Sequence, residues 1–280
     1  MKKFIAAFDG LKFSESTQEY AIYAAKNCNA HLVGVFLEDF TRHRYSIAEV
    51  STYNGADFDE HLKDLNHQEQ EERDRAVSLF EEACTRNGVT FTIHRDKNIA
   101  LQELLHESIY SDLLIIDASE TLSRYSEKAP TRFIRELLDD VQCPVLLVPP
   151  KFKPLQAVTL LYDGEPSSVF AVKMFSYVFD TLSVEQEVIS VKSQEESLHL
   201  PDNRLMKEFM KRHFPNAEYI VLKGLVEDEI IRYLQHHKKE SLVVLGAYRR
   251  GRISRIFRPS MADTLLRHLK VPLFIAHNKS

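Results

Sequence analysis

The chain has 280 residues, of which 44% are hydrophobic and 28% are charged, and its formal net charge is -5. These values are typical of a soluble globular protein of one or two domains, and the acidic balance argues against a general nucleic-acid-binding protein. The sequence contains no run of about 18 apolar residues, the length that a membrane-spanning helix needs. Its three isolated cysteines are typical of buried thiols in a reducing compartment. We therefore expect a cytoplasmic protein that binds neither nucleic acid nor membrane.

Short apolar runs alternate with segments of helical periodicity along the whole chain. In the first half we expect strand Phe4–Phe8, helix Ser14–Asn27, strand His31–Leu37, a long helix over 58–86, strand Thr90–Arg95, helix Ala100–Tyr110, strand Leu113–Asp117, helix Thr131–Asp140 and strand Val145–Val148. In the second half we expect strands near 157–162, 186–192, 218–222, 242–246 and 273–276. This alternation predicts an α/β fold with parallel, doubly wound sheets that helices cover on both faces.

The second half of the chain repeats the motifs of the first half in the same order. Asp9-Gly10 and Asp163-Gly164 each close an apolar strand, and Cys143-Pro144 and Val271-Pro272 each precede the last apolar run of their half. Such internal similarity predicts two copies of one structural unit. We assign them to residues 1–150 and 151–280.

The first copy is longer than the second between its first and fourth strands. The extra length lies in a charged segment of about residues 40–88, which contains the long helix expected over 58–86. Apolar residues return at helical spacing only toward its end, so we interpret the segment as a helix with a solvated end. A helix that binds a protein partner is the alternative.

A basic stretch in the second half is the best candidate for a binding site. Gly246 ends an apolar strand, and Ser260 and Asp263 have the spacing of a capping box at a helix start. The cationic loop between them contains Arg249, Arg250, Arg252, Arg255 and Arg258. A cationic loop next to a helix N-terminus favours an anion. An ordinary connection with a solvated basic face is the alternative.

With these motifs the chain resembles a tandem universal stress protein along nearly its whole length. The most specific parts are the Asp-Gly after the first strand, the loop Leu245-Gly246-Ala247-Tyr248 and the final helix–Pro–strand unit. The resemblance implies two tandem Rossmann-type domains (Usp/HUP-like) that pack as a pseudo-dimer. It also implies a stress-response or regulatory protein that is not an enzyme.

ATP-binding members of that family carry the loop G-x-x-G, nine residues, then G-(S/T), and an acidic residue after the first strand. In the second copy Asp163, Gly246 and Ser260 match this pattern, whereas Arg249 and Pro259 replace glycines. The resemblance therefore implies a degenerate site for ATP or AMP, with Mg²⁺ in the case of ATP. Its residues would be Asp163, Gly246, Arg249, Arg252, Ser260 and Met261.

The first copy departs further from this pattern. Asp117 and Glu120 occupy the two leading glycine positions, Pro130 occupies the third, and only Thr131 is kept. Two carboxylates repel a phosphate, so we expect the phosphate loop to be lost here. Asp9 then has a structural role, as a cap of the turn or helix that follows it.

The last strand of each copy is expected to pair with its counterpart. In the family this edge strand pairs antiparallel with the partner subunit, and Val145–Val148 and Leu273–Ala276 can make that pairing within one chain. Homodimerisation of the whole chain remains an additional expectation. No residue set predicts a metal site or a catalytic centre, but a ligand-free interaction module and a weak ATP hydrolase stay open as alternative functions.

Overall fold

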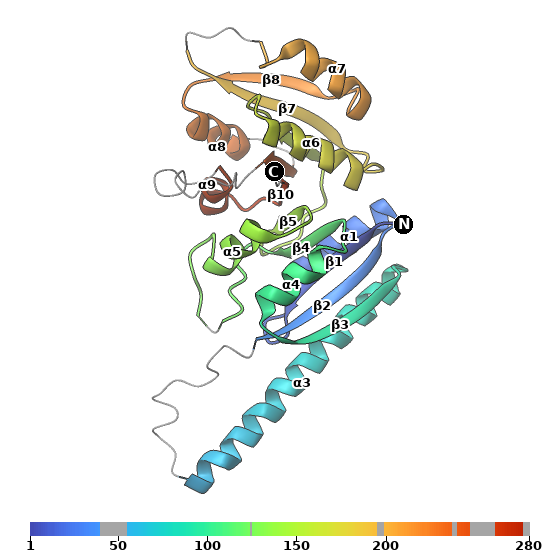
Figure 1. Ribbon diagram of the computed structural model, residues 1–280, viewed down its shortest axis with the longest axis vertical. Coiled ribbons are helices and arrows are strands. Elements are labelled where there is room, and N and C mark those ends of the chain that lie inside the picture. Colours follow the sequence, from blue (N-terminus) through green and yellow to red (C-terminus); the bar gives the residue numbers. More distant parts are fainter. Residues whose placement is uncertain (40–54, 124, 195–198, 237–239, 247–260, 277–280) are drawn as a thin grey trace.

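The computed structural model describes residues 1–39, 55–123, 125–194, 199–236, 240–246 and 261–276 (Figure 1). The first half contains β1 (Lys3–Asp9), α1 (Glu15–Cys28), β2 (His31–Asp39), α3 (Gly55–Asn87), β3 (Phe91–Asn98), α4 (Ala100–Ser108), β4 (Leu113–Asp117), α5 (Arg132–Asp140) and β5 (Val145–Val148). The second half contains β6 (Ala157–Leu161), α6 (Pro166–Val178), β7 (Glu185–Lys192), α7 (Asn203–His213), β8 (Glu218–Lys223), α8 (Val226–His236), β9 (Ser241–Gly246), α9 (Met261–His268) and β10 (Leu273–Ala276).

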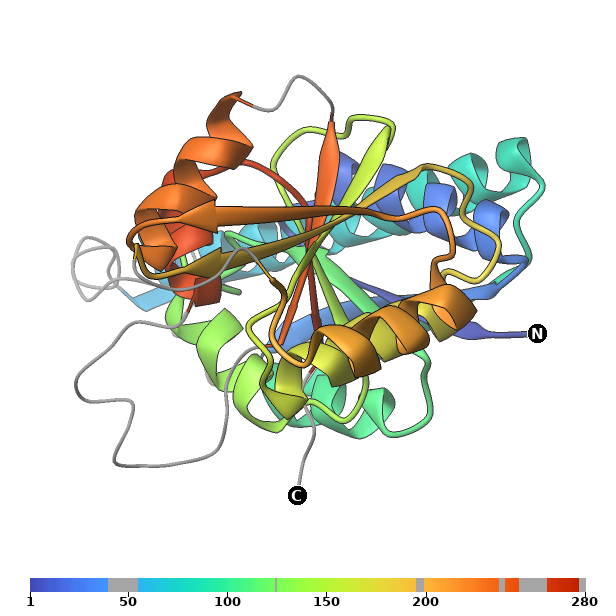
Figure 2. The same ribbon diagram turned by 90° about the horizontal axis from the view of Figure 1, so that it is seen from above.

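The strands form one sheet in the order β3-β2-β1-β4-β5-β10-β9-β6-β7-β8. Within each half neighbouring strands are parallel, and each half has the doubly wound order 3-2-1-4-5 counted along its own strands. Figure 2 shows the twist of this sheet, whose strands cross one another in the view from above. The predicted fold class, two tandem doubly wound domains packed as a pseudo-dimer, is confirmed.

The two halves meet where β5 pairs antiparallel with β10, with Leu146 opposite Phe274. Both strands are buried along their whole length. An apolar strand edge left open to water can pair with other chains and aggregate, and the pairing removes one such edge from each half. The chain thus joins its two copies through the backbone of their closing strands.

Polar contacts at the C-terminal ends of α1 and α6 also join the two halves. The Lys2 ammonium donates to the carbonyl oxygen of Val178 at 2.9 Å, at the C-terminal end of α6, and pairs with Asp180. The reciprocal contact runs from Thr181 to the carbonyl oxygen of Asn27 in α1. Each half therefore satisfies carbonyl groups at the end of the first helix of the other half, where the helix itself provides no partner.

Apolar side chains cover both faces of the sheet. One core combines residues of α1, α3, α6 and α7, and the other combines residues of α4, α5, α8 and α9. The first is rich in aromatic rings, and Phe8 contacts the rings of Phe36 and Phe80 at centroid distances of 5.1 and 5.4 Å. Both cores continue from one half into the other, so the sheet is covered on both faces as the alternation of elements predicts.

Helix boundaries follow local capping chemistry. The Ser14 side chain accepts a hydrogen bond from the backbone nitrogen of Thr17 at the start of α1, and Thr131 does the same for Ile134 at the start of α5. The prediction that the helix starting at Ala100 reaches Tyr110 is wrong, because α4 ends at Ser108 and Tyr110 lies in an exposed turn. The third strand extends past the predicted Arg95, because it keeps pairing with β2 as far as Asp39 and Asn98.

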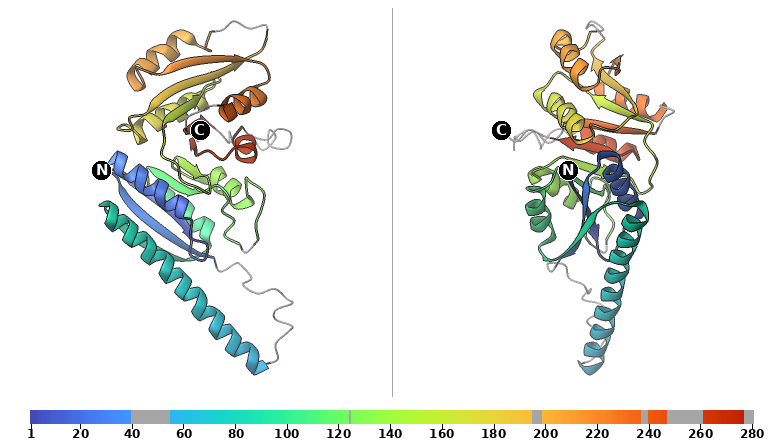
Figure 3. Two further views of the ribbon diagram at one scale, coloured as in Figure 1. Left: turned by 180° about the vertical axis from the view of Figure 1, so that it is seen from behind. Right: turned by 90° about the vertical axis from the view of Figure 1, so that its right-hand side faces the viewer.

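The long helix predicted over 58–86 is confirmed as α3, which extends well past the sheet (Figures 1 and 3). Among the α3 side chains that the structure describes, residues 63–87, the buried apolar ones all lie in the C-terminal part: Ala76, Val77, Phe80, Ala83 and Cys84. Arg73 lies where the helix leaves the sheet, with ion-pair distances of 3.7 Å to Glu38 and 3.6 Å to Glu69. The side chains of all three residues are only 10% exposed, so buried charges hold this part of the helix.

The three cysteines are free and buried, as expected. Burial raises the pKa of Cys28 to about 11 and that of Cys84 to about 12. These two thiols are therefore protonated and unreactive at neutral pH.

Among the described helices, none combines the length and the apolar character that a membrane crossing requires.

Candidate functional site

Each half of the sheet has one point at which the strand order reverses. In the first half it lies between β1 and β4, and in the second half between β6 and β9. Ligands of doubly wound sheets bind in the crevice beyond the carboxyl ends of the strands at this point. The strand pairing places Asp9 and Asp117 at one such point and Asp163 and Gly246 at the other.

In the second half, Asp163 is exposed and organises the start of α6. One carboxylate oxygen accepts hydrogen bonds from the backbone nitrogen of Glu165 at 2.9 Å and from the Ser168 hydroxyl at 2.7 Å. Carboxylates near a helix start commonly accept such bonds, which satisfy donors that the helix leaves free. Asp163 thus has a structural task at the site where the sequence places it.

Gly246 lies directly against the same helix. A Cβ atom at this position would lie 2.9 Å from the backbone nitrogen of Ser168 and even closer to the carbonyl oxygen of Ser167. The absence of a side chain therefore allows the end of β9 to approach the first turn of α6. This contact brings the Asp163 loop and the end of β9 together, and it explains the glycine without a ligand.

The other predicted site residues of the second half are only partly described. Met261 is half-buried at the start of α9. Asp263, the predicted partner in the capping box, is buried and lies 3.6 Å from the guanidinium of Arg135 in the first half. Arg249, Arg252 and Ser260 lie outside the described residues.

The equivalent point of the first half carries a cavity of about 510 Å³. Its lining includes Lys12, Ser14, Asp117, Glu120, Tyr125 and Glu127. Ser14 donates from its hydroxyl to one oxygen of Asp117 at 3.0 Å, and the other oxygen accepts from the backbone nitrogen of Ser119 at 2.8 Å. Sequence reasoning missed Lys12 and Ser14 as part of this cavity, because no motif links them to residues a hundred positions away.

Glu120 is the most perturbed acid of this cavity. It is only 8% exposed and accepts a hydrogen bond from the backbone nitrogen of Thr121 at 2.8 Å. Burial, followed by the nearby negative charge of Asp9, raises the pKa of Glu120 to about 7. The carboxylates expected at the two glycine positions therefore do lie at the point where a phosphate loop would be needed.

Asp9 and Thr131 have structural roles in this half. Asp9 accepts a hydrogen bond from the backbone nitrogen of Leu11 at 2.9 Å, which confirms the prediction that it caps the following turn. The Thr131 hydroxyl donates to the carbonyl oxygen of Glu120 and caps α5. Thr131 thus joins the Glu120 loop to the start of α5.

A second cavity, of about 1010 Å³, opens at the amino ends of β6 and β7. Beside it lies a buried polar row in which Thr159 donates to Glu187 at 2.6 Å and lies 2.7 Å from Ser241. The Tyr233 hydroxyl donates to Glu187 at 2.7 Å, and burial, followed by this bond, raises the pKa of Tyr233. The row joins three neighbouring strands to α8 at the end of the sheet opposite to the candidate site.

Comparison with known proteins gives a consistent result. Residues 156–277 match the model of the universal stress protein family. No curated protein matches the chain.

Within the described residues, no three His, Cys, Asp or Glu side chains are grouped so that they could hold a metal ion.

Solved structures cover both halves of the chain. This chain is similar to a universal stress protein from Archaeoglobus fulgidus DSM 4304, with a TM-score of 0.70 and 13% identity. The alignment covers 100% of this chain and 97% of the other. A functionally unknown protein from Pseudomonas aeruginosa PAO1 has a TM-score of 0.54 and 13% identity. That alignment covers 98% of this chain and 92% of the other. At these identities the similarity establishes the fold of the whole chain.

Proposed function

We propose that this chain belongs to the universal stress protein family, whose model matches residues 156–277. On that premise it acts in the cytoplasm as a non-enzymatic stress-response or regulatory protein. Its second half would hold one degenerate nucleotide or anion site, with ATP or AMP as the ligand and Mg²⁺ accompanying ATP. The first half would bind no nucleotide through the family loop.

The contrast between the two points of strand reversal carries this proposal. The second half presents Asp163 next to Gly246, whereas the first half presents Asp117 and the buried Glu120 at the corresponding place. Negative charge is repelled more strongly where carboxylates are desolvated. Among the described residues, the second point of strand reversal carries fewer carboxylates than the first, which favours phosphate there. Arg249, Arg252, Ser260 and Met261 would complete the proposed site.

The hydrogen bonds of Asp163 support a role other than catalysis. One of its two carboxylate oxygens already accepts two hydrogen bonds, from Glu165 and Ser168. These bonds commit the carboxylate to the first turn of α6. Absence of turnover with ATP and Mg²⁺ is the expected result, and turnover that Asp163→Asn abolishes would instead establish the weak hydrolase.

Thermal unfolding with millimolar ATP, ADP or AMP tests the nucleotide site. A ligand present at about 100 times its Kd stabilises the folded state by about 2.7 kcal/mol, which raises the Tm by several degrees. We expect Ser260→Ala and Asp163→Asn to reduce the shift, whereas Asp9→Asn, the equivalent change in the first half, leaves it unchanged. No shift with any of the three nucleotides would exclude the site in this concentration range.

Protein interaction through α3 is a second candidate function. The helix extends past the sheet, and Lys63, Asp64, Asn66, His67 and Gln68 are exposed there. Because β5 and β10 pair within the chain, a homodimer would also have to use other surfaces. Deletion of residues 55–68 would leave the packed part of α3 and Arg73 in place, and we expect the variant to fold but to lose its partner. Unchanged association of this variant would contradict the candidate.

A further inference from the structure

The cavity at the strand reversal of the first half contains a buried acid with an unused acceptor atom. Glu120 lines this cavity of about 510 Å³ and is only 8% exposed. Its Oε1 atom accepts hydrogen bonds from the backbone nitrogens of Thr121 at 2.8 Å and Leu122 at 2.5 Å. Among the described residues, none donates to its second oxygen, Oε2. One oxygen of a buried carboxylate thus remains open to a ligand in the cavity.

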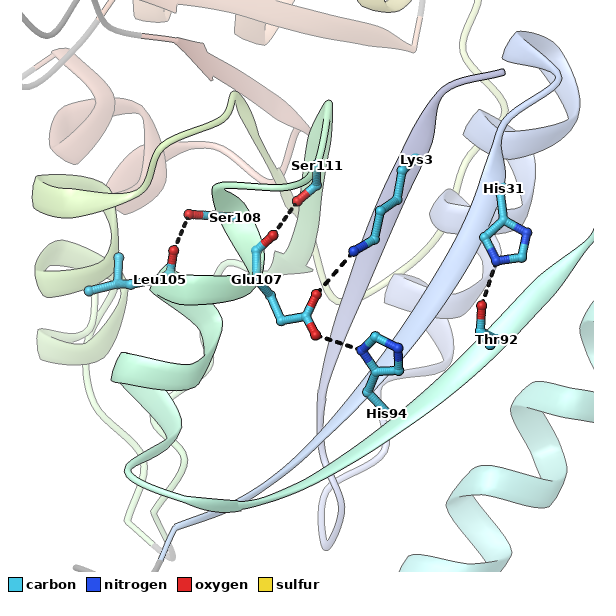
Figure 4. Close-up of polar contacts among 8 residues, drawn as sticks. All are labelled: Lys3, His31, Thr92, His94, Leu105, Glu107, Ser108 and Ser111. Atoms are coloured by element: carbon cyan, nitrogen blue, oxygen red, sulfur yellow. Dashed lines mark hydrogen bonds and ion pairs between the residues drawn. The ribbon is translucent and has the colours of Figure 1, made fainter.

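Glu107, in the same half, is a buried acid whose cations the protein itself supplies (Figure 4). Its carboxylate lies between Lys3 and His94, with the ammonium 3.1 Å from one oxygen and the Nδ1 atom 2.6 Å from the other. Burial acts to raise the pKa of Glu107, but these two partners outweigh it, so the pKa lies below its ordinary value. For Glu120, burial and then the charge of Asp9 raise the pKa to about 7. Within the described part of the chain, Glu120 lacks the cation that Glu107 has.

Asp9 adds a second buried carboxylate near Glu120. Asp9 is 8% exposed, and among the described residues its side chain accepts one hydrogen bond, from the backbone nitrogen of Leu11 at 2.9 Å. An ionised carboxylate has room for about four such bonds, so the two acids leave several acceptor positions open. Like charges that are shielded from water repel each other strongly. A bound cation with several N–H donors would supply both the missing charge and the missing hydrogen bonds.

The described walls of the cavity favour a polar cation over an anion. Lys12, the cation among the described lining residues, is exposed and donates to the carbonyl oxygen of Ser123. Glu15, Asp117 and Glu127 add further negative charge to the lining. Hydroxyl groups occupy much of the remaining wall: Ser14, Ser16, Ser119, Thr121, Tyr125 and Ser126. The volume lies in the range of sites that bind small molecules.

We propose that this cavity binds a small organic cation that carries a protonated amine and hydroxyl groups. The ammonium lies against Oε2 of Glu120, and the hydroxyl groups of the ligand face the hydroxyl side chains of the wall. Such a ligand also explains why the chain keeps an acid whose burial destabilises the fold. The site lies in the first half and is independent of the nucleotide site proposed for the second half.

Amide NMR of the full chain at pH 8, in an amine-free phosphate buffer, tests the cavity with a matched pair of probes. Glucamine is a protonated amino polyol, and sorbitol is its neutral counterpart with a hydroxyl group in place of the amine. We expect glucamine to shift the amide signals of Thr121 and Leu122, which contact Glu120, in a saturable way with a Kd of about 1 mM or below. Sorbitol at equal concentration should leave both signals unchanged.

A pair of variants then locates the binding charge. Glu120→Gln removes one negative charge and keeps the shape of the side chain, so it should weaken glucamine binding at least about tenfold. Glu19→Gln, at an exposed position of α1 that does not line the cavity, removes the same charge from the same half and should keep the wild-type Kd.

Two results with the wild-type chain would overturn the proposal without reliance on a variant. They are the absence of a saturable shift up to about 20 mM glucamine, and an equal response to sorbitol. Unchanged affinity in Glu120→Gln would also overturn it. Equal weakening in Glu120→Gln and Glu19→Gln would do the same, because it would mean a diffuse attraction to an acidic surface.

Discussion

The backbone nitrogen of Ser168 lies 2.9 Å from the point where a Cβ atom on Gly246 would stand. The end of β9 and the first turn of α6 are therefore in contact through backbone atoms. A side chain at position 246 would have to push this turn away, together with the hydrogen bonds that Asp163 makes to Glu165 and Ser168.

We expect Gly246→Ala to destabilise the protein by about 2–3 kcal/mol, because the neighbouring atoms are backbone and cannot rotate away. Denaturant unfolding measures this change. Gly88→Ala is the matched control, since Gly88 has a positive φ of 66° but no heavy atom within 4 Å of the added carbon. It should cost only about 1 kcal/mol, and equal losses for the two variants would contradict the steric explanation.

Glu120→Gln should stabilise the protein at pH 8 by about 2–3 kcal/mol, because the folded state raises the pKa of this carboxyl from 4.5 to about 7. The folded state binds the proton more tightly than the unfolded state does. The contribution of Glu120 to stability is thus fully present below about pH 4.5 and is lost as the pH rises through 7.

Unfolding curves of wild type and Glu120→Gln at several pH values between 4.5 and 8 measure this effect. The two stabilities should be similar at the acidic end and should diverge as the pH rises. A constant difference across this range would show that Glu120 does not titrate in the folded protein. Glu127→Gln, a substitution of an exposed residue that lines the same cavity, should show no such divergence.

Arg73→Ala should destabilise the protein by about 2–4 kcal/mol, because it leaves the buried carboxylates of Glu38 and Glu69 without the cation between them. Arg75→Ala, an exposed position two residues further along α3, should change stability by less than about 0.5 kcal/mol. Chemical denaturation of both variants makes the comparison. Similar effects for the two would mean that the buried charges do not stabilise this part of α3.

Cys28 and Cys84 should react slowly with a thiol reagent at pH 8 in the folded protein. Burial raises the pKa of each thiol, to about 11 and about 12, so the reactive thiolate is scarce and also shielded. Reaction should become rapid in guanidinium chloride, which serves as the control. Fast labelling of either residue without denaturant would contradict the burial of that thiol.

Elements that depend on local sequence could be predicted without the structure. The helix starts near Ser14 and Thr131, the long helix α3 and the strand that ends in Asp9 follow from hydrophobic periodicity over a few residues. The repeat of these motifs also determined that the chain contains two copies of one fold. The structural role of Asp9 follows from its place before a turn.

Contacts between distant positions required the tertiary structure. Glu107 meets His94 and Lys3, Ser14 meets Asp117, and Gly246 meets Ser167, and in each case the partners come from different elements. Spacing along the chain does not encode which side chains face each other across a sheet. The raised pKa of Glu120 likewise comes from burial and from Asp9, so only the folded sheet decides it. The sequence by itself therefore determined the elements and the repeat, and the packing of strands and helices decided what each charged residue does.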